Sequence, residues 1–401
     1  MTEEIKPMNI YLNNDKSNCC GCGACVNICP HNAICMKEDE YGFNYPLIKE
    51  DKCVGCNLCV SVCEKVNNNQ SDMPLIAFAG SHKNKQVLNK SSSGGVFSAL
   101  AEQFLENGGA VCGCVFNDEL KAVHICTEKE DDFLKIRKSK YLQSDVGFIY
   151  REIKSRLKNG QQVLFTGTPC QVAALYAVVG KNYPNLTTMD LICHGVPSQR
   201  MFDKFIEYLE KRYKTKITSF DFRSKKYGWQ RFTMEFTGSN NKVVNIGKYR
   251  EFYIPAFTGG NIIRPSCLSC KFACANRISD ITVGDFWGYE NSNLKLDTSK
   301  GMSVFTINTE NAKNLLSSLS EKLYFEEIDY KVAVTGNTCL HKPTPEGKKR
   351  ELYMQAIKNN NIEAVALKYR KSKKKSILRE KLRLLVPTRI FIAIKKHKSK
   401  N

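Results

Sequence analysis

Long hydrophobic runs are missing from this sequence. No stretch approaches the roughly 18 consecutive apolar residues that identify a membrane-spanning helix. The segment Met1–Asn18 is polar and charged, and it lacks the apolar core of a secretory signal peptide. We therefore expect a cytoplasmic protein without a membrane span. No recognisable nucleic-acid-binding module is present either, so we expect no nucleic-acid partner.

Acidic residues are scarce at the C-terminal end. The segment Lys368–Asn401 holds 14 Lys/Arg against one acid, Glu380, a net charge of +13 that leaves only +7 of the total +20 for the rest of the chain. Apolar residues are mixed with these cations between Ile377 and Ile394. A basic amphipathic segment is typical of proteins that dock on an anionic membrane surface. For this chain the expected surface is the inner face of the membrane. The alternative is a solvated helix packed on the body of the protein.

Cysteine, in contrast, is abundant. The 19 cysteines, without a secretion signal, indicate a reducing compartment and metal ligation. Two runs share the spacing C-x2-C-x2-C-x3-C; they are Cys19, Cys22, Cys25, Cys29 and Cys53, Cys56, Cys59, Cys63. This is the ligand pattern of bacterial ferredoxins with two [4Fe-4S] clusters. Structural zinc is disfavoured because it usually takes two C-x-x-C pairs.

In this pattern the fourth cysteine of each run binds the cluster of the other run. One predicted cluster therefore has the ligands Cys19, Cys22, Cys25 and Cys63, and the other has Cys53, Cys56, Cys59 and Cys29. The remaining nearby thiols, Cys20 and Cys35, are interpreted as bystanders. Cys112, Cys114, Cys126 and Cys339 lack ligand spacing and are expected to be structural.

The chain is long enough for two or three domains. Residues 67–72 are polar and predict a linker after the cysteine-rich unit. Beyond it, expected strands (75–79, 109–116, 162–166, 187–193) alternate with expected helices (96–107, 146–157, 172–179, 198–213), and 220–247 has the pattern of antiparallel strands. The predicted fold is an α+β ferredoxin-like N-terminal domain followed by an α/β core with a mixed sheet.

Two turns in this core precede helices. The amides of Ser91–Gly95 at a helix N-terminus suit a phosphate group, although serine is also an ordinary N-cap. Gly167–Gln171 connects a strand to a helix and places Cys170 at the helix head, where a thiolate is favoured. Turns at the carboxyl ends of strands are where α/β sheets bind ligands.

A further group of cysteines occurs later in the chain. Cys193 ends an expected strand and precedes His194, and Cys267, Cys270 and Cys274 follow at C-x2-C-x3-C spacing. Together with Cys170 they predict a third metal site, for zinc or, within an electron-transfer chain, an iron–sulfur cluster. His194 is a candidate proton donor or a structural histidine. The turn Asp280–Asp285 closes a loop or orients a ligand.

Six motifs occur in a characteristic order. They are Ser92–Val96, Lys140–Asp145, Gly167–Gln171, Asp190–Ser198, Cys267–Cys270 and Asp280–Trp287. Over roughly residues 76–308 the chain resembles the coenzyme F420 hydrogenase/dehydrogenase beta-subunit family, with the ferredoxin-type unit fused in front. The resemblance implies four parts: a 2[4Fe-4S] ferredoxin-type domain (1–70), the family's N-terminal-type domain (73–160), its C-terminal-type domain (161–345) and a basic amphipathic tail (346–401).

The resemblance also implies FAD in the α/β core beside a third [4Fe-4S] cluster. The implied FAD-site residues are Ser93, Gly94 and Gly95, with Lys140, Ser144, Gly167 and Thr168 as further candidates. The implied cluster ligands are Cys170, Cys193, Cys267 and Cys270, and Cys274 competes with Cys170 for one place because its spacing also suits ligation.

Three hypotheses about function follow. The first is an iron–sulfur flavoprotein oxidoreductase that passes electrons from a low-potential, ferredoxin-like donor through the clusters to FAD and on to an unidentified two-electron acceptor. The second is an electron-input subunit of a hydrogenase or dehydrogenase complex, which would include a coenzyme F420-linked one. The third is a membrane-surface scaffold or sensor with structural clusters.

Overall fold

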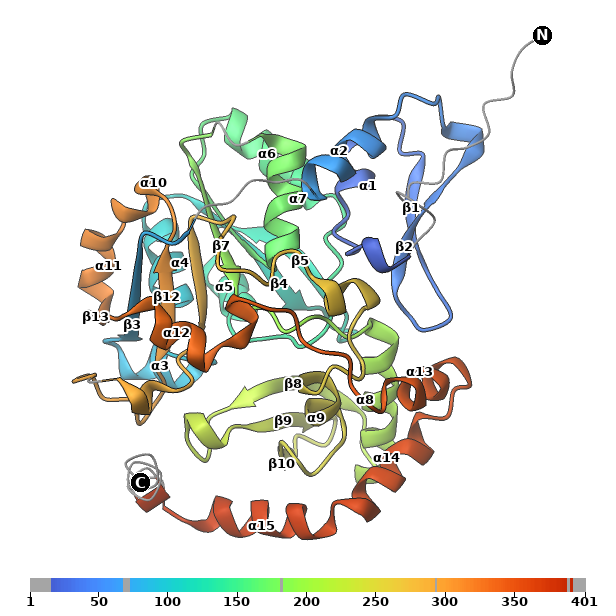
Figure 1. Cartoon of the computed structure of the whole chain (residues 1–401), viewed down its shortest axis with the longest axis vertical. Coiled ribbons are helices and arrows are strands. Elements are labelled where there is room, and N and C mark those ends of the chain that lie inside the picture. Colours follow the sequence, from blue (N-terminus) through green and yellow to red (C-terminus); the bar gives the residue numbers. More distant parts are fainter. Residues whose placement is uncertain (1–15, 68–72, 181–182, 293, 388–389, 392–401) are drawn as a thin grey trace.

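A computed structural model of the chain describes residues 16–67, 73–180, 183–292, 294–387 and 390–391. Its main feature is a mixed sheet of eight strands (Figure 1). In spatial order these are β13 (Leu323–Glu327), β3 (Ile76–His82), β12 (Ser303–Ile307), β11 (Ile281–Asp285), β7 (Leu186–Leu191), β6 (Val163–Gly167), β4 (Ala110–Phe116) and β5 (Ala122–Thr127). The four central strands β11, β7, β6 and β4 run parallel, and the flanking pairs are antiparallel. The predicted mixed sheet is confirmed.

Helices cover both faces of this sheet. Alternate residues of a strand point to opposite faces, and accordingly Val163 and Phe165 of β6 pack with α6 (Ile149–Lys158) and α7 (Pro169–Val179), whereas Leu164 packs with α4 (Val96–Glu106). The central strands are therefore buried on both sides, as parallel strands in α/β proteins are.

A small N-terminal unit packs on α6 and α7 (Figure 1). It contains α1 (Ala24–Ile28), α2 (Leu58–Asn67) and the hairpin of β1 (Ile34–Glu38) and β2 (Asn44–Ile48). The hairpin turns at 39–43, where the Asp39 carboxylate accepts from the amides of Tyr41 and Phe43. The predicted linker at 67–72 lies almost entirely outside the described residues.

A second, three-stranded sheet lies beside the large one. Its antiparallel strands are β8 (Ile217–Ser224), β9 (Thr233–Gly238) and β10 (Val243–Gly247), as the pattern of 220–247 predicts. Aromatic side chains, including Phe205, Phe220 and Phe222, fill the core between this sheet and α8 (Gln199–Tyr213). This sheet faces the turns that follow the large sheet's central strands (Figure 1).

The other α-helices are α3 (Lys85–Lys90), α5 (Glu130–Ile136), α9 (Tyr253–Thr258), α10 (Glu310–Lys313), α11 (Leu316–Lys322), α12 (Tyr330–Gly336), α13 (Arg350–Lys358), α14 (Ile362–Ser372) and α15 (Lys374–Leu385). Short 3-10 turns occur at Lys16–Asn18, Glu50–Lys52, Trp229–Arg231, Pro265–Ser269, Tyr289–Asn291 and Thr338–Leu340. No helix of the described residues is long and apolar enough to cross a bilayer.

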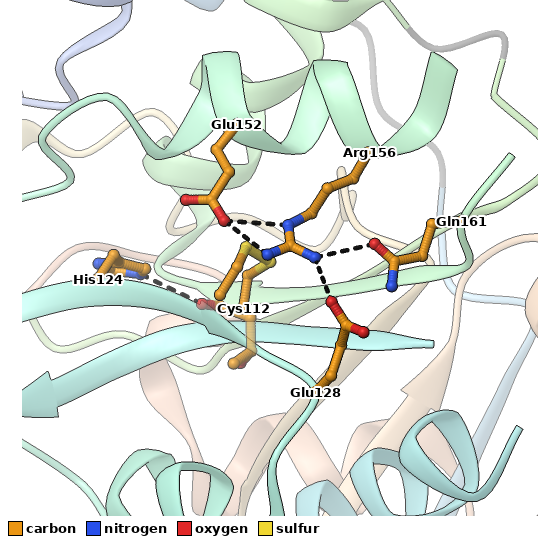
Figure 2. Close-up of a disulfide and its surroundings, with 8 residues drawn as sticks. Cys112, His124, Glu128, Glu152, Arg156 and Gln161 are labelled. Atoms are coloured by element: carbon orange, nitrogen blue, oxygen red, sulfur yellow. Dashed lines mark hydrogen bonds and ion pairs between the residues drawn. A yellow bond between two sulfur atoms is a disulfide. The ribbon is translucent and has the colours of Figure 1, made fainter. Parts of the chain in front are cut away.

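One cysteine pair, expected from its spacing to be structural, is oxidised although the sequence indicates a reducing compartment. Cys112 on β4 and Cys126 on β5 stand opposite each other in the strand register and form a disulfide (Figure 2). Cys112 is completely buried beneath α6. The spacing of the cysteines does not predict this disulfide. It depends on which residues of β4 and β5 lie opposite each other, and that register is visible only in the structure.

Candidate functional site

The first predicted cluster set comes together in the structure. Cys19, Cys22, Cys25 and Cys63 line one cavity in the N-terminal unit. Burial, together with the neighbouring Cys19 and Cys63, raises the pKa of the Cys25 thiol. Burial likewise raises the pKa of Cys63 to about 11. Bound iron would offset this cost of thiolate burial, so the donor set fits a cluster.

The second predicted set lies further from the core. Cys29 is buried and packs near Cys59, whose pKa is raised by burial and by the proximity of Cys53 and Cys56. Cys53 and Cys56 are exposed. This end of the N-terminal unit is therefore the one that an external electron carrier can approach.

The third group of cysteines forms a cavity at the carboxyl ends of the central strands. Cys170, Cys193, Cys267 and Cys270 all line it, although they come from three different segments of the chain. The alternative ligand, Cys274, lines a separate small cavity, and its thiol donates to the Asn276 carbonyl at 3.2 Å. The geometry therefore supports Cys170 over Cys274, as the resemblance implies.

Each of these cysteines is partly buried. Burial raises the pKa of Cys267 to about 12 and also raises the pKa of Cys193, and in each case the nearby Cys270 adds to the shift. Sulfur donors of this kind suit soft metal centres such as iron–sulfur clusters. Among the described residues, no three ligating side chains converge on the position of a single metal ion.

Cys170 is placed by the local sequence. Thr168 is the N-cap of α7 and forms a capping box with Gln171, while Pro169 occupies the first helical turn. The Thr168 hydroxyl also contacts the Cys170 sulfur at 3.1 Å. The turn thus fixes the thiol at the helix head, as the sequence predicts.

His194 lines the same cavity, next to Cys193. Its Nδ1 lies 3.5 Å from the Cys339 sulfur. This hydrogen bond raises the pKa of His194 against the opposing effect of burial. The sequence shows no partner for Cys339. In the structure its thiol contacts the imidazole of His194, the candidate proton donor.

Cys20 is the residue that sequence reasoning missed. It lines the third cavity and also the cavity of the first set, so that it lies between the two. Its thiol lies in contact with Cys170 and with Cys22, which also lines both cavities. No spacing rule could place it there, because Cys170 is far away along the sequence.

The turn Ser91–Gly95 lies against the edge of β3 and β12. The Gly94 amide donates to the Ser303 hydroxyl at 2.8 Å, and the Ser93 hydroxyl donates to the Met302 carbonyl at 2.8 Å. A Cβ on Gly94 would lie 2.1 Å from the Gly80 carbonyl oxygen, so only glycine fits. Gly95, with φ of 86°, starts α4.

A line of contacts joins this turn to the cysteine cavity. The Ser139 amide donates to the Ser92 hydroxyl at 2.9 Å. Next to Ser139, the Lys140 amine donates to main-chain carbonyls at the end of α5, and burial lowers its pKa to about 8. Ser144 accepts from Gln171 at 3.0 Å and lines the cysteine cavity together with Thr168. Gly167 immediately precedes Thr168 at the end of β6.

Cations gather around the Ser91–Gly95 turn, which the sequence motifs did not reveal. Arg223 is buried, pairs with Asp285 at 2.7 Å and donates to the Ser92 carbonyl. Its Nε has no hydrogen-bond partner among the described residues. Lys225 donates to the Ser93 carbonyl, and burial lowers its pKa to about 7. Buried cations beside a helix N-terminus fit a phosphate-bearing cofactor such as FAD.

Comparison with known families agrees with this arrangement. Two models of one family match the chain: coenzyme F420 hydrogenase/dehydrogenase, beta subunit N-term, over residues 77–148, and the C terminus of the same subunit over residues 160–333. The chain belongs to the coenzyme F420 hydrogenase/dehydrogenase beta-subunit family. A 4Fe-4S dicluster domain matches residues 18–66 in front of it.

Membership of this family makes the chain an oxidoreductase-type subunit that carries an iron–sulfur domain. Among solved structures, a chain of the F420-reducing [NiFe] hydrogenase complex from Methanosarcina barkeri is similar, with 17% identity, a TM-score of 0.44, and coverage of 76% of this chain and 93% of that one. No curated protein gives a significant match.

Proposed function

We propose that this family member is an iron–sulfur flavoprotein oxidoreductase. It accepts electrons singly from a low-potential, ferredoxin-like donor and delivers them in pairs to an acceptor that the sequence does not identify. When bound, the clusters supply one-electron transfer and FAD supplies two-electron storage. The observation that carries the proposal is the cavity lined by Cys170, Cys193, Cys267 and Cys270, which Cys20 and Cys22 of the N-terminal unit also line.

Each part of the chain has a role in this proposal. The exposed Cys53 and Cys56 mark the side at which the donor docks. Arg223 and Lys225, with the amides of the Ser91–Gly95 turn, hold the FAD phosphates. His194 holds a proton beside the acceptor. The domain limits stay as the sequence predicts them, at 1–70, 73–160, 161–345 and 346–401.

A second candidate function is that of an electron-input subunit without a substrate of its own, docked on a hydrogenase or dehydrogenase. Membership of a family of beta subunits favours it. An isolated chain that consumes a small-molecule oxidant without other subunits would contradict this candidate. We also propose that the tail Lys368–Asn401 docks on an anionic membrane surface.

The composition of anaerobically purified protein tests the main proposal. Three clusters and one flavin predict about 12 iron atoms and one FAD per chain. Cys193→Ala should lose about four iron atoms, because it removes a ligand of the third cluster alone. Cys274→Ala is the matched control and should keep its iron, since Cys274 faces a different cavity.

Two results would contradict the proposal. An iron content of about eight atoms in the unmodified protein would show that the third cluster is absent. Iron-loaded protein without flavin, whose clusters are not reduced by dithionite, would instead favour the scaffold or sensor hypothesis.

A further inference from the structure

Six cysteines line the third cavity: the four predicted ligands together with Cys20 and Cys22. Cys22 is already a predicted ligand of the first cluster, so Cys20 is the one without a predicted role. A [4Fe-4S] cluster takes four thiolates, one on each iron. The Cys20 thiol lies in contact with Cys170, a ligand of the proposed third cluster, and with Cys22, a predicted ligand of the first. A thiol that touches a ligand sulfur of each cluster lies between the two sets of ligands and does not itself bind iron.

The backbone around Cys20 is held in place by the core. Gln143 donates from its side-chain amide to the carbonyls of Cys20 and Gly21, both at 3.1 Å. Arg264, which is completely buried, donates to the Cys19 carbonyl at 2.7 Å and to the Gln143 side chain at 3.0 Å. These contacts come from the family core and fix a residue of the N-terminal unit at the junction of the two cavities.

The space at Gly21 shows how tight this junction is. A Cβ added there would lie 2.5 Å from the Gln143 amide nitrogen and 2.9 Å from the Arg264 guanidinium. Gly21 also has φ of 66°, which other residues rarely adopt. The segment Cys20–Gly21 therefore enters the core in one conformation, and the position of the Cys20 thiol follows from it.

We propose that Cys20 is the contact residue between the first and the third cluster, a thiol that remains unligated and donates its single S–H to the sulfur of the third-cluster ligand Cys170. The inference rests on the proposed function, because it needs the third cluster. With both clusters bound, the Cys22–Cys20–Cys170 contact would lie between their ligands, and no bond at Cys20 would be made or broken when one electron passes. Cys20 acts as a positioning residue because hydrogen bonds to ligand sulfurs tune cluster potentials.

The experiment compares Cys20→Ala, Cys20→Ser and the unmodified protein, with Cys35→Ala as the matched control. Cys35 is a half-buried thiol on β1 that bonds the Leu47 carbonyl and lines neither cavity. All four proteins should hold the same iron per chain. In Cys20→Ala the midpoint potential of the third cluster, followed by EPR during redox titration, should become more negative because a hydrogen bond to its ligand sulfur is lost.

The rate of electron passage gives a second readout. After rapid mixing with dithionite and freeze-quenching, the third cluster of Cys20→Ala should be reduced about tenfold more slowly, the size of effect typical for removing an outer-shell partner. Cys20→Ser keeps a donor and should restore the potential. Loss of about four iron atoms from Cys20→Ala would show that Cys20 is a ligand and overturn the proposal.

An unchanged potential and rate in Cys20→Ala would also overturn it, while leaving the proposed function intact. If the unmodified protein itself lacks the third cluster, the proposed function fails first. The two failures are therefore separable in one set of samples.

Discussion

At the scale of single residues, His124 links protonation to stability. It is buried on β5, where its Nε2 lies 3.3 Å from the Thr166 carbonyl and its ring stacks on Phe165. Its Nδ1 has no hydrogen-bond partner in the described part of the chain. Burial, reinforced by the charge of Lys140, lowers the pKa of His124 to about 4. The folded protein therefore keeps this imidazole neutral.

The sign of the resulting pH dependence follows directly. An unfolded chain binds a proton at His124 below about pH 6.5, whereas the folded chain does so only below about pH 4. Stability is therefore full above pH 6.5 and falls as the pH drops towards 4, by about 2 kcal/mol at pH 5. His124→Gln, which cannot titrate, should flatten this part of the stability curve in denaturant titrations from pH 7 to 5. His31→Gln, at an exposed site, should leave it unchanged; equal slopes in both variants would disprove the assignment.

At the scale of elements, α15 has one side packed on the protein and one exposed apolar side. Ile377, Glu380 and Leu384 face the body of the protein, where Glu380 accepts from the Tyr249 amide and Arg231 donates to the carbonyls of Arg383 and Val386. The opposite side exposes Leu378, Leu382 and Leu385, at 59%, 57% and 78% of their surface. Figure 1 shows this helix running along the outside of the molecule beside β10. The contacts that hold α15 on the body of the protein do not involve these three leucines, so folding does not depend on them.

An exposed leucine side among cations is the arrangement that binds anionic lipid interfaces. Replacing Leu378, Leu382 and Leu385 together with serine should weaken binding to phosphatidylserine vesicles by about a hundredfold. Three leucines that become partly buried in the lipid interface contribute about 3 kcal/mol or more to binding. Leu352→Ser with Leu367→Ser is the control, since these leucines are exposed on the neighbouring helices α13 and α14. Undiminished vesicle binding after the triple change, or after truncation behind Tyr369, would rule out membrane docking.

The individual helices and strands also show what sequence patterns can and cannot predict. The expected helix 96–107 and strand 109–116 match α4 and β4 closely, because periodicity and flanking glycines are local signals. The antiparallel addition of β12 and β13 to β3 was not predicted, since it depends on contacts between distant parts of the chain. The Cys112–Cys126 disulfide and the position of Cys20 were missed for the same reason.

At the scale of the whole molecule, the N-terminal unit is attached to the core by side chains of α6. The Arg151 guanidinium donates to the carbonyls of Val26 and Asn27 at 2.9 and 2.6 Å, and also to the Cys29 carbonyl. It thereby satisfies the C-terminal carbonyls of α1, which a helix leaves unpaired. Tyr150 adds a bond to the Cys22 carbonyl at 2.9 Å. The predicted cluster ligands are thus positioned by a helix of the core.

Arg151→Ala should therefore loosen the N-terminal unit without unfolding the large sheet. Charge-assisted hydrogen bonds contribute about 1.5–3 kcal/mol each, so the opening free energy of residues 18–66 should fall by about 3 kcal/mol or more. Hydrogen exchange measured by mass spectrometry would show faster exchange in α1 and α2 and unchanged exchange in β6 and β7. Arg156→Ala is the control, because this arginine of the same helix pairs instead with Glu128, Glu152 and Gln161 (Figure 2). If both variants exchange alike, Arg151 does not dock the unit, and the path from the N-terminal cysteines to Cys170 must be held by other contacts, such as those of Arg264, Gln143 and Tyr150.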